Sequence, residues 1–475
     1  MDKATFRKYG HELVDWIADY FDKVEQYPVK SSVKPGEIKS RLPTSPPDKG
    51  EDMEIIWKDF QKLILPGITH WQHPGWFAYF PANNSPASVL GELLAAGLGA
   101  QCMVWATSPA AEELEEVVLD WLRQMLGLPK GLKGVIQDTA STATLVALLT
   151  AREAATNFTS NDKGLQENLK IYSSRETHSS IEKGVKIAGY GRENLRYIAT
   201  DEDYALRPDK LEEAIQEDLE RGEKPACVVA TIGTTSSTAI DPLPEIGEIC
   251  DRYDLWLHVD AAFAGTAALL EEKRDLLAGA EYLDSFVFNP HKWMLTNFDC
   301  SAYFVRDPEL LIRTLAINPE YLKTARDDEV NNYRDWGIQL GRRFRALKLW
   351  FVIRDYGVEG LKDIIRRHIK LAEEFAGWIR EDKELELLAP VSTSLVCFRW
   401  NNGSTPPEEL NKINKKILDS INQSGEVFLT HTKLDGKYTI RLVVGQRTTG
   451  KKQVERAWQI IKQVVAEVTD QDQNY

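Results

Sequence analysis

Four short polar stretches each follow a run of apolar residues that is typical of a buried strand. They are Gln-Asp-Thr-Ala-Ser-Thr at 137–142, Arg-Glu-Thr-His-Ser-Ser at 175–180, His-Val-Asp-Ala-Ala at 258–262 and Asn-Pro-His-Lys-Trp at 289–293. Ligands of open parallel sheets bind beyond the carboxyl ends of the strands, so chemistry is expected at these positions. Together the stretches could supply a phosphate cradle, an imidazole face, a carboxylate and an amine.

Each stretch also has an ordinary structural interpretation. The residues at 139–142 could simply cap the following helix, which is the more frequent case, although a helix N-terminus also offers N–H groups to a phosphate. His178 could be a capping or core histidine, and Asp260 could belong to a structural salt bridge. Lys292 could lie at the surface, but its aromatic neighbours disfavour full exposure. A buried lysine shifts toward neutrality and becomes a nucleophile that forms Schiff bases.

Taken together, the four stretches match the needs of pyridoxal phosphate, an electron sink that a protein binds and orients. Metal, P-loop and hydrolase chemistry lack support. His11 and Glu12 begin a zincin-like string, but Asp15 stands where its second histidine belongs, and neither a P-loop nor a G-x-S-x-G string is present. The sequence therefore predicts a pyridoxal phosphate site and no metal site.

The sequence is similar, almost from end to end, to the group II pyridoxal-phosphate-dependent amino acid decarboxylases, and most closely to the aromatic L-amino acid decarboxylases. The resemblance is carried by His-Val-Asp-Ala-Ala, by Asn-Pro-His-Lys-Trp, by HWQHPGWFAYFP at 70–81 and by GRRFR at 341–345. It implies the aspartate aminotransferase-like α/β fold (fold type I). That fold has a mostly parallel seven-stranded sheet with helices on both faces and a smaller α+β C-terminal domain.

The resemblance also implies a role for each matching residue. Lys292 would hold the cofactor, Asp260 would keep its pyridine nitrogen protonated, and His178 would stack on its ring. Tyr321, on a mobile loop, would be the general acid that protonates Cα. The other implied cofactor-binding residues are Thr139, Ala140, Ser141, Thr235, Asn289 and His291. The implied substrate residues are Trp71, Tyr79, Phe80, Pro81, Ala82, Cys102, Met103 and Gly341.

The implied activity is decarboxylation of tryptophan, phenylalanine, tyrosine or their hydroxylated forms to aromatic amines. The alternative is an aldehyde synthase, which also oxidises the product; such relatives change the residue at Tyr321 or His178, and both are retained here. A non-catalytic scaffold is disfavoured by the same intact residues. The usual family pattern is not followed at Ala82, Phe263, Asp138 and Thr142. Glycine, as at Gly341, is the residue that plant relatives accepting indolic rings have at the matching position. Those departures leave the order of substrate preference open.

Three segments are expected along the chain. An amphipathic helix, followed by an irregular Pro-rich stretch at 28–50, predicts an N-terminal helical arm over 1–85 that packs on a second copy. Alternating strand and helix patterns predict a large cofactor-binding domain over 86–349. The remainder, 350–475, predicts a small domain with strands at 395–400 and 438–444 and a closing helix.

Charge and cysteine content narrow the partners and the compartment. The chain has 58 basic and 72 acidic residues, a net charge of −14 without a basic block, which argues against nucleic acid or anionic membrane. Five cysteines without C-x-x-C spacing favour a reducing compartment. The uncharged run 93–111 is interpreted as buried core, and no signal peptide is recognised. We therefore expect a cytoplasmic homodimer with its active site at the subunit interface and a small aromatic amino acid as substrate.

Overall fold

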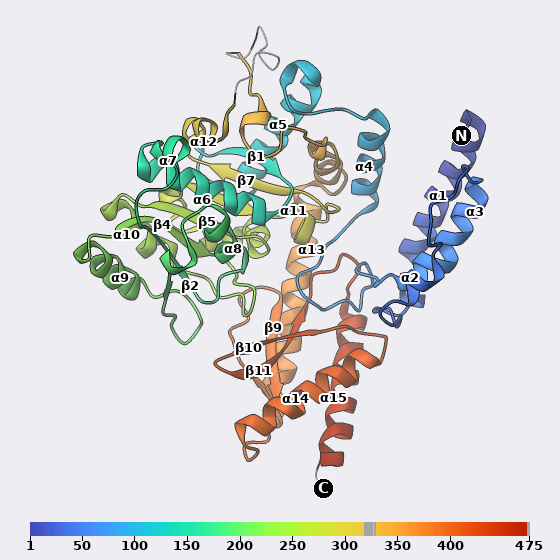
Figure 1. Cartoon of the computed structure of the whole chain (residues 1–475). Coiled ribbons are helices and arrows are strands. Elements are labelled where there is room, and N and C mark those ends of the chain that lie inside the picture. Colours follow the sequence, from blue (N-terminus) through green and yellow to red (C-terminus); the bar gives the residue numbers. More distant parts are fainter. Residues whose placement is uncertain (318–325, 327–328, 473–475) are drawn as a thin grey trace.

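A seven-stranded sheet forms the centre of the larger part of the protein (Figure 1), a computed structural model that describes residues 1–317, 326 and 329–472. The strand order is β1-β7-β6-β5-β4-β2-β3, and only β7 runs against the others in this sheet. The strands are β1 Lys133–Gln137, β2 Leu169–Ser174, β3 Leu195–Ile198, β4 Lys224–Thr231, β5 Trp256–Asp260, β6 Ser285–Phe288 and β7 Ser301–Val305. The mostly parallel seven-stranded sheet expected from the resemblance is confirmed.

Helices cover both faces of this sheet, so its central strands β5 and β6 are buried along their whole length. One face packs against α6, α8 and α12, and the other against α5, α9 and α10. The helices of this part are α5 Pro109–Leu126, α6 Ala140–Thr156, α7 Thr159–Lys163, α8 Ser180–Ile187, α9 Pro208–Glu220, α10 Leu243–Tyr253, α11 Pro290–Trp293 and α12 Pro308–Leu315. Two apolar layers therefore hold the sheet rigidly between them.

The parallel pairing brings the polar stretches to one edge of the sheet. In the ladder, His258, Val259 and Asp260 of β5 lie opposite Ser285, Phe286 and Val287 of β6. Strands β1, β2, β4, β5 and β6 all run in the same direction and end at this edge. The residues that follow them are therefore neighbours in space although they are far apart in the sequence.

A second, antiparallel sheet has the strand order β10-β11-β9-β8 and its own apolar core. Its strands are β8 Leu385–Leu387, β9 Leu395–Trp400, β10 Thr430–Leu434 and β11 Lys437–Val443; its helices are α13 Arg345–Glu381, α14 Pro407–Gln423 and α15 Lys451–Asp472. The long helix α13 joins the two sheets and bends at Gly357, which has a positive φ of 63°. The two strands expected here are present, whereas β8 and β10 were not predicted.

The N-terminal segment stands apart from both sheets (Figure 1). It contains α1 Lys3–Lys23, α2 Glu37–Arg41 and α3 Met53–Asp59, and α4 Pro86–Leu98 follows it. The short helix α2 corrects the expectation that 28–50 is wholly irregular. None of the helices in the described parts of the chain is long and apolar enough to cross a membrane.

The interpretation of 93–111 as buried core is wrong for its first part in the single chain. Leu93, Leu94 and Leu98 of α4 are 50–66% exposed. Phe6 of α1 is likewise exposed, and every residue of α1 keeps part of its surface open. The single chain thus leaves apolar side chains of α1 and α4 uncovered.

Candidate active site

A cavity of about 240 Å³ lies at the carboxyl edge of the large sheet. It is lined by Phe80, Thr139, Ala140, Ser141, His178, Thr231, Gly233, Thr235, Asp260, Ala262, Phe263, Asn289, His291, Lys292 and Phe298. All of the cofactor-binding residues expected from the sequence are in this set. The structure therefore brings together groups that the sequence places on separate strand ends.

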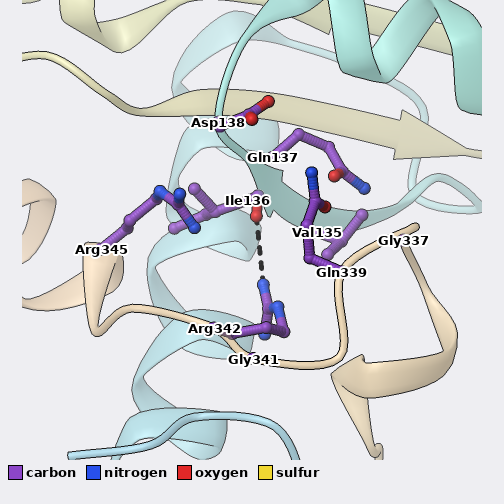
Figure 2. A pocket seen from close by; sticks show the side chains of 9 residues that line it. All are labelled: Val135, Ile136, Gln137, Asp138, Gly337, Gln339, Gly341, Arg342 and Arg345. Atoms are coloured by element: carbon purple, nitrogen blue, oxygen red, sulfur yellow. Dashed lines mark hydrogen bonds between the residues drawn. The ribbon is translucent and has the colours of Figure 1, made fainter.

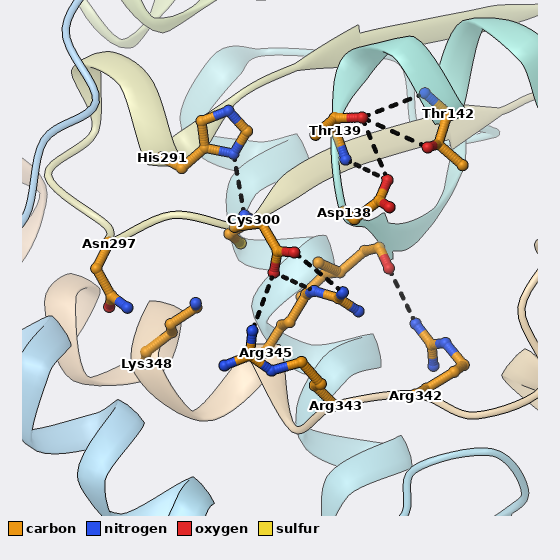
Figure 3. A network of polar contacts seen from close by, with 12 residues as sticks. Asp138, Thr139, Thr142, His291, Asn297, Cys300, Arg342, Arg343, Arg345 and Lys348 are labelled. Carbon is orange, nitrogen blue, oxygen red and sulfur yellow. Dashed lines mark hydrogen bonds and ion pairs between the residues drawn. The ribbon is translucent and has the colours of Figure 1, made fainter. Parts of the chain in front are cut away.

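One end of the cavity is formed by the N-terminus of α6. Thr139 is the N-cap, and its hydroxyl accepts a hydrogen bond from Thr142 N at 3.4 Å, as Figure 3 shows. The helix begins at Ala140, directly after this cap. The first N–H groups of a helix have no partners within it, so those of Ala140 and Ser141 are available to a phosphate.

His291, which also lines the cavity, presents a neutral N–H donor. Its Nδ1 accepts the backbone N–H of Cys300 at 3.0 Å (Figure 3), so the ring proton resides on Nε2. Burial, with a contribution from the Lys292 ammonium, lowers the pKa of His291 to about 3. Asn289 accepts a hydrogen bond from Ser301 Oγ at 2.5 Å through its Oδ1, which leaves its amide NH₂ as a donor. The cavity therefore offers donors suited to an anion.

Lys292 and Asp260 both line this cavity and interact electrostatically. Asp260 ends β5 and is 4% exposed, and its Oδ1 accepts the backbone N–H of Ala262 at 3.0 Å. Lys292 lies in α11, directly after β6. Burial lowers the pKa of Lys292, while the Asp260 carboxylate acts in the opposite direction. This arrangement favours a nucleophilic amine beside a carboxylate that can hold a proton on a ring nitrogen.

His178 lies near both charged groups, just before α8. Its Nδ1 is 2.8 Å from Ser180 Oγ. Desolvation lowers the pKa of His178, the Asp260 carboxylate opposes this shift, and Lys292 adds to it. The residue as a whole is exposed in the single chain. A neutral imidazole at this position can present its flat face to a heterocycle in the cavity.

The cavity fits pyridoxal phosphate by an observation independent of the resemblance. Thr231 Oγ1 lies on its wall, is buried, and has no hydrogen-bond partner among the described residues. Gly233 has a φ of 81°, and a Cβ there would lie 2.4 Å from the Cβ of Ala264, so the wall cannot carry a side chain at this point. The anion donors, the amine and the carboxylate complete the groups that this cofactor needs. Elsewhere in the described residues, no cluster of His, Cys, Asp and Glu could hold a metal ion.

Several lining residues were missed by sequence reasoning. Ala262 and Phe263 directly follow Asp260, so their proximity could have been inferred from the strand end. Thr231 is the last residue of β4 and Gly233 follows two positions later, so their strand end gave the same signal. Arg441 had no such signal: it comes from β11 of the second sheet, donates to Thr235 O at 2.8 Å, and lies 5.5 Å from the centre of the Phe80 ring.

The expected substrate residues are distributed over three places. Phe80 lines the cavity. Trp71 and Tyr79 lie outside its wall and stack on one another, with their ring centres 5.9 Å apart. Pro81 and Ala82 also lie outside the wall: Pro81 lies against Gly445, and the Ala82 carbonyl accepts a hydrogen bond from Gln72. Tyr321 lies outside the described residues.

Cys102, Met103 and Gly341 belong to a different region of the single chain. Cys102 N donates to Arg342 O at 3.0 Å, and Arg334 N donates to Met103 O at 2.9 Å. Gly341 lines a separate small cavity of about 50 Å³ with Asp138 and Arg345 (Figure 2). One copy of the chain therefore does not bring these three residues into the main cavity.

Comparison with known proteins agrees with this geometry. The pyridoxal-dependent decarboxylase conserved domain matches residues 35–401. The chain is 46% identical to phenylacetaldehyde synthase of Arabidopsis thaliana, covering 98% of this chain and 96% of that protein, and 45% identical to tryptophan decarboxylase 2 of Oryza sativa subsp. japonica with the same coverage. The crystal structure of Oryza sativa TDC with PLP and tryptamine superposes with a TM-score of 0.95 at 38% identity, over 98% of this chain and 99% of that one. The chain therefore belongs to the pyridoxal-dependent decarboxylase family.

Proposed function

We propose that the protein binds pyridoxal 5'-phosphate and decarboxylates aromatic L-amino acids to aromatic amines and carbon dioxide. The observation that carries this proposal is that Lys292, Asp260, His291 and the N-terminus of α6 line one cavity. The names of the tryptophan decarboxylase and the phenylacetaldehyde synthase support an aromatic substrate. Phe80 supplies an aromatic wall on which such a side chain could pack.

The chain's own residues have distinct tasks in this proposal. When bound, pyridoxal phosphate supplies the electron sink for cleavage of the bond between Cα and the carboxylate. Lys292 Nζ would bind its carbonyl carbon, and Asp260 would hold a proton on its ring nitrogen. His291 Nε2–H and the first N–H groups of α6 would bind its phosphate, and His178 would cover one face of the ring. Tyr321 is proposed as the acid that delivers a proton to Cα.

A homodimer is the proposed assembly, with the active site at the interface. Apolar side chains of α1 and α4 are uncovered in the single chain, and the expected substrate residues Cys102, Met103 and Gly341 lie away from its own cavity. A second copy that covers these helices could place those residues against the partner's cavity. We propose the divisions 1–85 for the arm, 86–349 for the large domain and 350–475 for the small domain.

The proposed compartment is the cytoplasm. All five cysteines are buried and unpaired, as expected for a protein kept under reducing conditions. The absence of a basic block in the sequence disfavours nucleic acid and anionic membrane as partners.

An aromatic aldehyde synthase is the second candidate. It is favoured by the 46% identity to phenylacetaldehyde synthase, which is as high as the identity to the decarboxylase. Both candidates release carbon dioxide, but only the synthase consumes oxygen and forms ammonia and hydrogen peroxide with the aldehyde.

One experiment separates these outcomes. The purified holoenzyme is given equal amounts of tryptophan, phenylalanine, tyrosine and 3,4-dihydroxyphenylalanine, and carbon dioxide, amines, aldehydes, ammonia and peroxide are measured together. We expect stoichiometric amine and carbon dioxide. Ammonia and peroxide in equal amounts with aldehyde would establish the synthase instead. Lys292→Ala protein should lack the visible absorbance of the bound cofactor; a fully active Lys292→Ala protein would contradict the assignment of this lysine.

A further inference from the structure

Four aromatic rings connect the cavity wall to α13: the first three are stacked, and the fourth lies edge to edge with the third. Phe80 stacks on Phe263 with ring centres 4.0 Å apart and planes at 12°, and Phe263 stacks on Trp293 at 4.6 Å and 11°. Trp293 in turn lies parallel to His368, with ring centres 6.4 Å apart and planes at 5°. We refer to Phe80, Phe263, Trp293 and His368 as the aromatic column. Of its members, only Phe80 was expected from the sequence to meet a substrate.

The inner end of the column is fixed by a hydrogen bond. Trp293 Nε1 donates to Nδ1 of His368 at 2.9 Å. Burial lowers the pKa of His368 to about 3, so its ring is neutral and Nδ1 remains an acceptor near neutral pH. Phe263 and Trp293 are each only 1% exposed. Because protein interiors are close-packed, neither ring has free space into which it can move.

The outer end of the column reaches the cavity. The Phe80 ring centre lies 5.6 Å from Lys292 Nζ and 5.5 Å from Arg441 Cζ. Phe80 is therefore confined between Phe263 on one side and two cationic groups of the cavity region on another. Since Trp293 directly follows Lys292 in the chain, the same column also supports the segment that carries the reactive amine.

We infer that Phe263 is a positioning residue that sets, through Phe80, the size of the aromatic side chain that the site accepts. The inference rests on the proposed function, because it assigns the specificity of that same cavity. With the column intact, Phe80 cannot retreat toward the core, so the room beside Lys292 has a fixed limit. A side chain at 263 that does not stack would allow Phe80 to move inward. The affinity for a two-ring indole would increase more from this movement than the affinity for a single phenyl ring.

The test uses the holoenzyme and two amines, tryptamine and phenethylamine, whose binding is followed through the visible absorbance of the bound cofactor. In Phe263→Leu, we expect the affinity for tryptamine relative to phenethylamine to rise about tenfold, the lower end of the range that a single methylene can produce in an apolar pocket. The ratio of kcat/KM for tryptophan over phenylalanine should rise in parallel. Phe263→Tyr keeps the stacked ring and should keep both ratios within about twofold of the wild type.

Phe375→Leu is the matched control. Phe375 is a fully buried phenylalanine of α13 that packs in the core of the small domain. The same substitution there should lower the melting temperature without changing either ratio. If Phe263→Leu does not fold, Phe263→Met has a similar volume and carries the same expectation.

The outcomes of the two proposals are distinguishable. Ratios unchanged in Phe263→Leu, or changed equally in Phe375→Leu, would overturn the role of the column while decarboxylation stands. A wild-type protein that releases no carbon dioxide from any aromatic amino acid would overturn the proposed function, and the amine affinities would still test the column. A holoenzyme that binds neither amine would overturn both.

Discussion

His291 accepts the backbone N–H of Cys300 at its Nδ1, 3.0 Å away, and this contact fixes the proton of the ring on Nε2. Burial holds the pKa of His291 at about 3, far below neutrality. The imidazole is therefore neutral near neutral pH and can donate from Nε2 to the phosphate that we propose it binds. A charged histidine would have made cofactor binding pH-dependent, and this geometry avoids it.

Replacement of His291 by phenylalanine should weaken pyridoxal phosphate binding about tenfold to hundredfold, since one hydrogen bond to a charged group is lost. The loss should be the same at about pH 6 and pH 9, because the pKa of His291 lies well below both. Equilibrium titration of the apo-protein with the cofactor measures this loss of affinity. Cys300→Ser, which keeps the backbone N–H, is the control. A loss that is larger at low pH than at high pH would mean that the ring is charged in the native protein.

Substitution of Asp260 by asparagine should move the pKa of Lys292 further down. Burial already lowers this pKa, and the carboxylate is the group that opposes the shift. The neutral amine is the nucleophile, so the rate at which apo-protein captures pyridoxal phosphate should reach half of its maximum at a lower pH in Asp260→Asn. Decarboxylation should fall about a hundredfold or more, because the proton on the ring nitrogen is no longer held.

The control for that experiment is Asp284→Asn. Asp284 precedes β6 at the opposite edge of the sheet, and it accepts the Leu257 N–H at 2.7 Å. Its substitution should leave the pH dependence of cofactor capture unchanged. An Asp260→Asn protein that captures the cofactor with the wild-type pH profile would remove Asp260 from the ring end of the site.

Residues at the ends of strands could be placed from the sequence because their positions follow from local patterns. Thr139 is a capping residue two positions after β1, Asp260 is the last residue of the buried strand β5, and Lys292 follows the buried strand β6. Parallel pairing then brings these ends together without any further information. The short strands β8 and β10 could not be found this way: β8 has only three residues, and β10 is an edge strand whose first four residues are polar.

Contacts between distant parts of the chain carried no local signal. Arg441 reaches the cavity region from the second sheet, and its guanidinium binds backbone carbonyls that any residue types could present. The sequence pattern predicts that the exposed leucines of α4 belong to the core, because an apolar run has the same composition whether it packs within a chain or against another one. Hydrophobicity indicates that a side chain will be buried, but it does not indicate whether the same chain or a partner buries it.

Glu112 should make stability pH-dependent. Burial, with a further contribution from Glu115, raises its pKa to about 8 from an ordinary value of 4.5. The folded state thus holds a proton that the unfolded state releases, so stability should fall as pH rises from about 4.5 to 8. Each pKa unit between the folded and unfolded values of Glu112 corresponds to about 1.4 kcal/mol in the free energy of unfolding. Denaturant unfolding at several pH values should show this fall in the wild type and a flatter profile in Glu112→Gln.

The neighbouring Glu113 supplies the control for Glu112. Glu113 is exposed and accepts a hydrogen bond from Trp105 Nε1 at 2.8 Å, which glutamine can also accept. Glu113→Gln should therefore follow the wild-type pH profile. Parallel profiles for the wild type and Glu112→Gln would show that Glu112 is ionised in the folded protein.

Leu94→Glu should dissociate the proposed dimer. Leu94 is 50% exposed on α4, and a charge buried against a second copy would lose its hydration without a partner. Light scattering coupled to size exclusion should report a monomer, and carbon dioxide release should fall because Cys102 and Met103 of one copy no longer reach the other. Leu219→Glu is the matched control: Leu219 is 48% exposed on α9, on a helix that we assign to no interface, and its variant should remain dimeric and active. A Leu94→Glu protein that stays dimeric and fully active would exclude α4 from the interface.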